Sequence, residues 1–486
     1  MNTMNYANLF TITLPETILE VISLIVLVVD LGLLRKSTQA ARMTAACVLG
    51  VAGCVAAIAW LALHVQSIGI FGDALAATPL VAAAQVGILL LSALVLLLSI
   101  KAEFSRNPGE FVAIVLLATT GMMLVAAARD LLIIFVALEL LSLSLYVLTA
   151  FAKSSAQSAE AALKYYLFGG MSAAMMLFGF SYLYGMTGTT SLAGIAASLA
   201  AQPASPLLVV ALVLVAAGFG FKVAAVPFHL WAPDTYQGAP APVTALIASG
   251  SKVASFAVLI ALTDGFLSLS PSLQTPSWTV LLLSMAAASI VLGNLAALAQ
   301  TSVRRLLAYS AIAHAGYMLL CIAAHTSQSG AAVLYYALTY ALTTVGAFGV
   351  IAIVERSSGS DRLDAFAGLS RRNPLLAGTM LLFLLSLAGI PPLVGFWAKF
   401  NLFAAVLRAP SAGHWGLALV ALALGASAVS LYYYLQVLKR IYVLKPSQSE
   451  PLHVSFVELA TLTLIALAVV LLGILPGALS GWIPLG

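Results

Sequence analysis

Charged side chains are scarce in this sequence. Only 8% of its 486 residues are Asp, Glu, Lys or Arg, whereas 62% are hydrophobic. A water-soluble domain has about 25% charged residues, so this chain lacks the polar surface that water requires. Its apolar runs are continuous and about 20 residues long, the length of a membrane-spanning helix, and they lack the alternation of transmembrane barrel strands. The composition therefore predicts an all-α polytopic membrane protein.

Cofactor-binding motifs are missing as well. The three cysteines, Cys47, Cys54 and Cys321, are scattered through apolar runs without a C-x-x-C pair. The sequence has neither G-x-G-x-x-G nor G-x-x-x-x-G-K-[ST], and its His, Asp and Glu residues do not cluster at metal-ligand spacing. We therefore expect no nucleotide, haem, iron–sulfur or metal site on this chain. The net charge of +5 indicates membrane topology in so apolar a protein, and we expect no nucleic-acid partner.

Apolar windows separated by polar breaks predict fourteen spans. The N-terminal segment has no positively charged region, so the first apolar run is expected to be a retained span and not a cleaved signal peptide. The predicted spans are residues 14–34, 42–63, 78–100, 110–128, 131–151, 160–186, 206–231, 240–263, 277–299, 303–324, 331–354, 374–403, 415–442 and 454–476.

Basic residues are distributed unevenly between the two sides of these spans. With the N-terminus outside, the loops after odd-numbered spans and their flanks hold fifteen of the 21 Lys and Arg residues, and the other side holds two, Arg129 and Arg408. Basic loops stay in the cytoplasm, so both termini are predicted on the outer face. The fifteen are Arg35, Lys36, Arg42, Lys101, Arg106, Lys153, Arg304, Arg305, Arg356, Arg362, Arg371, Arg372, Lys439, Arg440 and Lys445.

The four remaining basic residues, Lys164, Lys222, Lys252 and Lys399, lie within predicted spans. A cation at the centre of a membrane helix costs about 2.5–3.5 kcal/mol, so several of them together indicate an interior polar pathway. Lys164 lies close to the end of its span, where its side chain could equally snorkel to the interface. Lys252 lies in the middle of its run, where snorkelling is not expected.

Three other ionisable residues are candidates for the same pathway. Glu139 lies within the run DLLIIFVALELLSLSLYVL and is a candidate counter-charge for the lysines, the alternative being a protonated or hydrogen-bonded carboxyl. His314 lies within LLAYSAIAHAGYML, where a relay and simple hydrogen-bonded packing are both open. His229 lies beside a proline, where a relay and a capping role are both open.

Prolines interrupt two of the predicted spans. Pro227 cannot donate to the carbonyl of Val223, so the helix should kink or unwind just after Lys222. A second break is expected at Pro391 and Pro392, two turns before Lys399. Irregular backbone at membrane depth is tolerated where it is buried or lines a wet cavity. A lysine beside such a break can gain and lose a proton, and neighbouring lysines would titrate together.

The interrupted spans are the seventh and the twelfth, five apart. Spans 4–8 and 9–13 are therefore predicted to be two five-helix repeats, and because five is odd the second enters the membrane from the opposite side. We expect one membrane domain over residues 1–486, with flanking helices in 1–105, repeats in 106–265 and 266–445, and a last helix in 446–486.

Three segments carry a resemblance to a known family. They are GFGFKVAAVPFHLWAPDTYQGAPAPVTALIASGSKVASF, QTSVRRLLAYSAIAHAGYML and GIPPLVGFWAKF. The chain resembles the antiporter-like membrane subunits of bacterial respiratory complex I, the proton-pumping NADH:quinone oxidoreductase, over its whole length. Within that family it is most similar to the subunit N group, because span 12 carries Lys399 where subunit M is expected to have Glu, and no long lateral helix follows span 14 as in subunit L.

The resemblance implies a role for each candidate. Glu139 would match the glutamate of span 5 that pairs with Lys222, Lys252 the central lysine of span 8, and Lys399 the lysine facing the exit side. The remaining two matches are His314, a polar link between half-channels, and Lys164, a span-6 lysine near the pair.

The resemblance also implies partners and a location. The partners would be other complex I subunits, in particular subunits M, K and J, together with the lipid bilayer and protons. NADH, FMN, iron–sulfur clusters and quinone would bind on those other subunits. The location would be the bacterial inner membrane.

Two other functions are compatible with the same residues. One is a Na+/H+ antiporter subunit of the Mrp type, because the two families share a fold. The other is a scaffold in which the buried charges fix the register of the helices; single lysine-to-alanine changes would then impair assembly without selectively abolishing transport.

Overall fold

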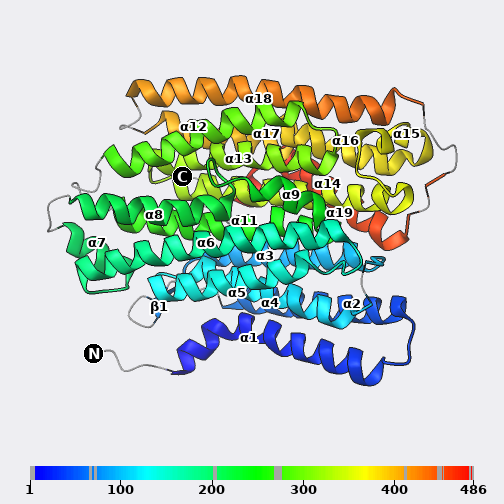
Figure 1. The fold of residues 1–486 in the computed structure, drawn as a ribbon, viewed down its shortest axis with the longest axis horizontal. Helices are drawn as coiled ribbons and strands as arrows, with labels where there is room; N and C mark the ends of the chain where they lie inside the picture. The colour runs from blue at the N-terminus through cyan, green and yellow to red at the C-terminus, as the bar shows by residue number, and fades with distance from the viewer. Residues whose placement is uncertain are drawn as a thin grey trace.

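The computed structural model describes residues 6–64, 68–70, 74–104, 106–200, 205–267, 276–409, 413–445, 451–452, 454–480 and 483. In these ranges the chain is a bundle of long, roughly parallel helices with α1 (Tyr6–Val28) at one edge and α18 (Gly413–Tyr442) at the other (Figure 1). The predicted all-α class is confirmed.

The other helices and strands follow in chain order. They are the π-helix η1 (Val29–Leu33), α2 (Gln39–Leu63), β1 (Ile68–Ile70), β2 (Leu75–Ala77), α3 (Pro79–Ser99), α4 (Pro108–Ala127), α5 (Leu131–Thr149), α6 (Ala156–Thr187), α7 (Leu192–Ala200), α8 (Pro206–Val223), α9 (Trp231–Gly238), α10 (Ala241–Ala248), α11 (Gly250–Leu267), α12 (Pro276–Leu298), α13 (Val303–Ala324), α14 (Ser329–Ser358), the 3-10 helix η2 (Leu363–Phe366), α15 (Leu369–Arg372), α16 (Pro374–Ala388), α17 (Val394–Leu407), α19 (Phe456–Ile474) and α20 (Gly477–Ser480). The two strands form a small antiparallel hairpin between α2 and α3.

The number of spans agrees with the sequence. Thirteen stretches of the described chain are helical, long and apolar enough to cross a membrane. The shorter apolar helices α16 and α17 form the remaining predicted span between them. The interrupted spans take the fourth place in each set of five, as two inverted repeats require.

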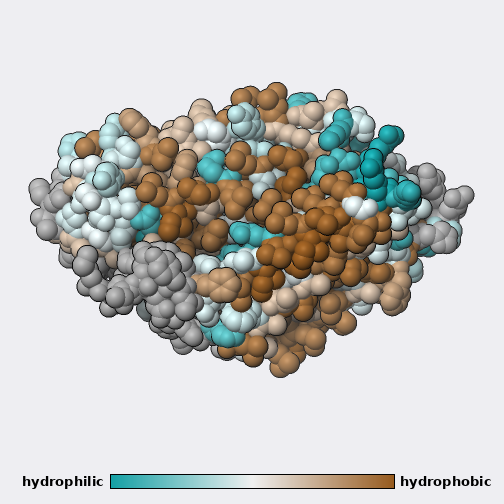
Figure 2. Space-filling view, turned by 90° about the horizontal axis from the view of Figure 1, so that it is seen from below, coloured by the Kyte–Doolittle hydropathy of each residue, from teal (hydrophilic) through white to brown (hydrophobic). Residues whose placement is uncertain are grey.

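The outer surface of the bundle is apolar. On α5, Leu132, Val136, Leu143 and Val147 are all at least half exposed and share one face of the helix. Apolar residues cover a broad area across the middle of the molecule, while hydrophilic residues gather at its right-hand end (Figure 2). So broad an exposed apolar surface would be unusual on a water-soluble monomer. These faces therefore meet lipid or neighbouring subunits.

Both predicted helix breaks are present. Helix α8 ends at Val223, and Ala224 takes a left-handed conformation with φ 59°. Helix α16 ends at Ala388, where Gly389 has φ 86° and α17 starts only at Val394. A Cβ on Gly389 would come within 2.9 Å of the Lys399 side chain, so glycine meets two needs there, the positive φ and the space for the lysine.

A third break was not predicted. The span expected over 240–263 is divided into α10 and α11 at Ser249, whose φ and ψ of −116° and −89° are not helical. The sequence Ser249-Gly250-Ser251 marks this point, because serine competes with the helical backbone for hydrogen bonds and glycine weakens a helix. Lys252 consequently lies in the first turn of a new helix.

An ion pair holds the last span against the second repeat. Arg356, at the end of α14, donates two hydrogen bonds of 2.7 and 2.9 Å to Glu458 in the first turn of α19. Glu458 is buried and also accepts from the backbone amide of Ser455, with which it forms a capping box. Removing the arginine would leave a buried carboxylate without its counter-charge.

We expect Arg356→Ala to lower the free energy of unfolding by about 2 kcal/mol. This is less than the roughly 3–5 kcal/mol for a fully enclosed pair, because 34% of the Arg356 side chain is exposed. Thermal denaturation of the purified protein in detergent would measure the change. Arg362→Ala is the matched control, since Arg362 is exposed at the same end. Equal midpoints for the two variants would contradict this role for the ion pair.

Candidate functional site: buried lysines at helix breaks

Three lysines are buried inside the bundle. Lys222, Lys252 and Lys399 are 8%, 2% and 7% exposed. Each lies next to an interruption of its own span: in the last turn of α8, in the first turn of α11, and in α17 after the Gly389 break. The salt bridges formed among the described residues include none to these three ammonium groups. Their partners are neutral oxygens and aromatic rings.

Lys222 contacts helix α5 through a hydroxyl group. Its Nζ donates to Ser142 Oγ, and Ser142 in turn donates to the carbonyl of Leu138. Side chains satisfy two backbone groups at the break. Trp231 Nε1 donates to the carbonyl of Phe221 over 3.0 Å, and Val226 N donates to Ser289 Oγ over 2.9 Å. The C-terminal end of α8 carries a partial negative charge that favours a cation at Lys222.

Glu139 lies one turn before Ser142 on α5. Its side chain is partly exposed, between the exposed Val136 and Leu143, yet its Oε1 is buried without a hydrogen-bond partner among the described residues. No direct ion pair joins Glu139 to Lys222, and the contact expected from the resemblance is made instead by Ser142. Glu139 is therefore a nearby carboxyl at the edge of the bundle, not the hydrogen-bond partner of Lys222.

Lys252 reaches from the first repeat to the second. Its Nζ donates to the carbonyl of Ala311 on α13 over 2.6 Å and lies 5.6 Å from the ring centroid of Tyr340 on α14. The ring of Tyr340 also packs against that of His314, with centroids 4.8 Å apart. One tyrosine thus contacts both Lys252 and His314.

His314 is buried among tyrosine hydroxyls. Its Nδ1 lies 2.6 Å from Tyr336 Oη and its Nε2 lies 3.4 Å from Tyr434 Oη, which is also hydrogen-bonded to Ser310. Each of these groups can both donate and accept a hydrogen bond. These contacts are compatible with both alternatives left open by the sequence, a proton relay and hydrogen-bonded packing.

Lys399 is the third of the buried lysines, and Lys222, Lys252 and Lys399 are called the lysine row below. Its Nζ donates to the carbonyl of Ala388 over 2.8 Å and to Ser427 Oγ on α18 over 2.7 Å. Ala388 is the last residue of α16, so the break leaves its carbonyl free for the lysine. A small cavity lies between His314 and Lys399, and its polar lining includes Thr339, Thr343 and Ser386.

The residues of the first break differ in exposure. His229 is buried, and its Nδ1 has no hydrogen-bond partner among the described residues. Pro227 and its neighbour Leu230 are exposed on the surface. At the second break, Pro391 and Pro392 are likewise exposed.

Lys164 lies apart from this row. Its side chain is 39% exposed and pairs with Glu160 at 2.7 Å and with Asp234 on α9 at 2.8 Å. Asp234 also pairs with Arg305 at 2.6 Å. This cluster joins α6, α9 and α13 at one end of the bundle, which agrees with the snorkelling alternative for Lys164.

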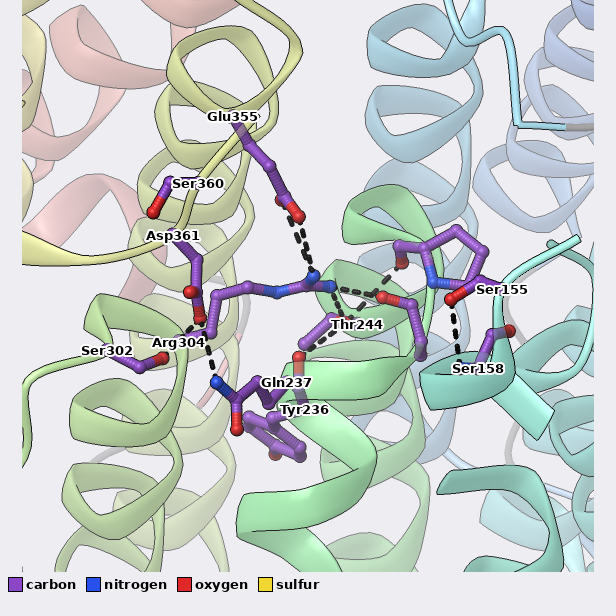
Figure 3. A network of polar contacts seen from close by, with 12 residues as sticks. Ser155, Ser158, Tyr236, Gln237, Thr244, Ser302, Arg304, Glu355, Ser360 and Asp361 are labelled. Atoms are coloured by element: carbon purple, nitrogen blue, oxygen red, sulfur yellow. Dashed lines mark hydrogen bonds and ion pairs between the residues drawn. The ribbon is translucent and has the colours of Figure 1, made fainter. Parts of the chain in front are cut away.

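A buried arginine was not among the predicted site residues. Arg304 is 3% exposed and donates to the carbonyl of Ala239, to Thr244 Oγ1 over 2.9 Å and to Glu355 Oε1 over 3.2 Å (Figure 3). Its sequence neighbour Arg305 points instead to Asp234. Two adjacent arginines at the end of a span look alike in the sequence, so only the structure distinguishes them.

A cavity lies at the same end as Arg304. Its charged and polar lining consists of Glu103, Ser155, Gln157, Gln237, Arg304, Glu355 and Arg356. Beside it, Gln237 Nε2 donates to Asp361 over 3.4 Å, and Ser302 Oγ donates to the same carboxylate (Figure 3). This end of the bundle thus has a polar opening that borders α10, the helix before Lys252.

A family model matches the part of the chain that holds the three buried lysines. Residues 128–431 match the family described as NADH:quinone oxidoreductase/Mrp antiporter, transmembrane. The chain belongs to this family. The match covers α5 to the greater part of α18 and so includes every residue of the lysine row.

Two relatives match the chain over nearly its whole length. The chain is 50% identical over 500 residues to NADH-quinone oxidoreductase subunit N 2 of Acidobacterium capsulatum, covering 99% of this chain and 100% of the relative. It is 39% identical to F(420)H(2) dehydrogenase subunit N of Methanosarcina mazei, covering 95% of both chains.

Solved structures show the same fold. A chain of respiratory complex I from Thermus thermophilus superimposes with a TM-score of 0.79 at 35% identity, over 95% of this chain and 97% of that one. A chain of the Mrp complex from Dietzia sp. gives a TM-score of 0.82 at 22% identity, over 97% of both chains. The second similarity concerns the fold alone.

The Lys164 cluster yields a pH prediction. Burial raises the pKa of Asp234, but hydrogen bonds and charge from Lys164 and Arg305 lower it by more, so the net pKa is below its ordinary value. A carboxyl with a lowered pKa stabilises the fold above its unfolded pKa of about 3.9, and this contribution is lost only as pH falls through the lower folded value.

We therefore expect Asp234→Asn to lower thermal stability by at most about 1 kcal/mol, because the cluster is partly exposed. The difference from wild type should stay constant from about pH 8 to about pH 5, where the carboxylate remains ionised. Denaturation midpoints across that range would measure it. A difference that shrinks between these two pH values would contradict the lowered pKa.

Proposed function

We propose that the chain is a proton-translocating subunit N of a bacterial NADH:quinone oxidoreductase, respiratory complex I. The observation that carries the proposal is the row of buried lysines, each beside a helix break and bonded to neutral oxygens. An ammonium held only by hydroxyl and carbonyl groups can release its proton without leaving a buried carboxylate unpaired. A row of such groups is suited to passing protons through the membrane.

The proposed route has three parts. Protons enter from the cytoplasmic cavity beside Arg304 and reach Lys252 in the first repeat. They cross to the second repeat by way of Tyr340 and His314, and the cavity lined by Thr339 leads to Lys399 at the exit. Lys222 and Glu139 lie at the other end of the row, where a change in the charge of one alters the proton affinity of the other. His229 borders the Lys222 break and is proposed as a member of the relay, whereas Lys164 pairs with Asp234 outside this route.

The relatives support the placement in the complex. Subunit N of NADH-quinone oxidoreductase is the name of the relative that is 50% identical. We propose that this chain carries no redox group, that NADH, FMN, iron–sulfur clusters and quinone bind to other subunits, and that quinone reduction there drives the protons here. The exposed apolar faces of the bundle would contact subunits M, K and J and the lipid.

The topology completes the proposal. The protein would lie in the bacterial inner membrane with both termini on the periplasmic side, because the basic loops favour the cytoplasm. It would work as one membrane domain with five-helix repeats in 106–265 and 266–445, flanked by 1–105 and 446–486. An Mrp-type Na+/H+ antiporter subunit is the alternative, and the fold of the Dietzia chain is compatible with it.

The test is Lys252→Ala in the assembled complex reconstituted into vesicles. Removal of a proton carrier should reduce NADH-driven proton uptake by roughly tenfold or more, with assembly verified on a native gel. Lys164→Ala is the control and should retain most of the activity, because Lys164 lies outside the row. Wild-type uptake in Lys252→Ala would contradict the proposal, and NADH-independent exchange of Na+ for protons would favour the antiporter alternative.

A further inference from the structure

A buried carboxyl that takes part in no ion pair among the described residues lies outside the lysine row, on the first span. Pro15 interrupts the hydrogen bonding of α1 because it cannot donate to the carbonyl of Thr11. That carbonyl accepts instead from Trp60 Nε1 on α2 over 2.9 Å. The next residue, Glu16, turns toward α3 and is 5% exposed. The proline and tryptophan thus fix the place at which Glu16 enters the bundle.

Only one oxygen of this carboxyl is bonded. Glu16 Oε1 accepts from Gln85 Nε2 over 2.9 Å, and the same amide lies 3.4 Å from the carbonyl of Met123 on α4. Glu16 Oε2 is buried and has no hydrogen-bond partner among the described residues. Burial of an ionised carboxylate with a single neutral donor is strongly unfavourable.

A cavity adjoins the unpartnered oxygen. Its lining includes Glu16 and Gln85 together with Thr11, Thr13, Thr78 and His64. His64 is exposed and stacks on Trp60 with ring centroids 3.8 Å apart. The cavity therefore runs from the surface at the end of α2 to a polar floor made by Glu16 and Gln85, and such a cavity can admit water.

The charged and titratable groups that face Glu16 do not neutralise it. On α1 itself, Glu20 follows one turn later and is exposed; on α2, Cys54 is buried and His64 lies at the cavity mouth. Helix α3 presents Gln85 and α4 presents Leu124 and Ala127. Arg129, just after α4, donates to the carbonyls of Ala126 and Ala128. None of the ion pairs among the described residues includes Glu16.

We propose that Glu16 is a second protonatable site of this chain, a carboxylic acid at neutral pH that exchanges its proton with the aqueous phase through this cavity. Metal binding is the weaker alternative, because a hard cation needs about six oxygen ligands and most of the lining is apolar, including Ile12, Pro15, Leu61 and Ala82. The site is separate from the lysine row and has its own opening.

A carboxylic acid in an apolar site reacts with an apolar carbodiimide. The acid O–H proton moves to a carbodiimide nitrogen while the carboxyl oxygen bonds to the central carbon, and the resulting O-acylisourea rearranges to a stable N-acylurea. This is an addition with no leaving group and no oxidant. An ionised carboxylate lacks the proton that the first step requires, so labelling reports the protonated form.

The experiment treats the assembled complex with diisopropylcarbodiimide at neutral pH and maps the adducts by peptide mass spectrometry. Glu16 should be labelled in preference to Glu103, an exposed carboxyl in the loop between α3 and α4, because water at an exposed site hydrolyses the O-acylisourea before it can rearrange. Labelling at Glu16 should fall as the pH is raised. Glu16→Gln should lose the adduct, and Glu103→Gln should keep it.

An infrared spectrum provides a measurement that does not depend on reagent size. The wild-type complex should show a carboxylic acid carbonyl band that shifts in D2O and is absent from Glu16→Gln. Equal labelling of Glu16 and Glu103, or the lack of both the adduct and the band, would overturn the proposal. A band that does not shift in D2O would overturn the exchange through the cavity.

Discussion

The cost of a charge inside the bilayer is the constraint on which this structure depends. Three ammonium groups are buried in a bundle whose outer surface meets lipid. Each one lies beside an interruption of its own span. At Gly389 the break itself supplies the acceptor, the carbonyl of Ala388, whereas Lys222 and Lys252 donate to Ser142 and to the carbonyl of Ala311 on neighbouring helices.

The two repeats meet at these groups. Lys252 belongs to the first repeat but donates to Ala311 in the second, and Tyr340 contacts both Lys252 and His314. The polar row is therefore made by the packing of the repeats against one another and not by either repeat alone. A movement at the Lys222 end could alter proton affinity along the row, because interacting titrations are coupled.

Much of the fold followed from the sequence alone. Apolar runs of helical length predicted the spans, and Pro227 and the pair Pro391-Pro392 predicted two of the three breaks, because proline removes a hydrogen-bond donor whatever its surroundings. The break at Ser249 was missed because serine and glycine only weaken a helix, and tertiary packing decides whether it opens.

Side-chain partners were harder to predict. The contact of Lys222 with Ser142 instead of Glu139, the burial of Arg304 beside the more exposed Arg305, and the inward turn of Glu16 all depend on how helices rotate against each other. A repeating apolar pattern specifies this rotation poorly when the outer face of the helix is apolar too. The general position of the lysine row could be predicted, but its hydrogen-bond partners could not.

The central claim is that the buried lysines carry protons and do not merely hold helices in place. Lys222→Arg tests it most directly, since arginine keeps the positive charge and its hydrogen bonds but does not release its proton in a protein. The measurement is NADH-driven proton pumping by the assembled complex in vesicles. We predict normal assembly with pumping largely lost. Assembly together with pumping at the wild-type rate would contradict the account and make Lys222 a structural charge.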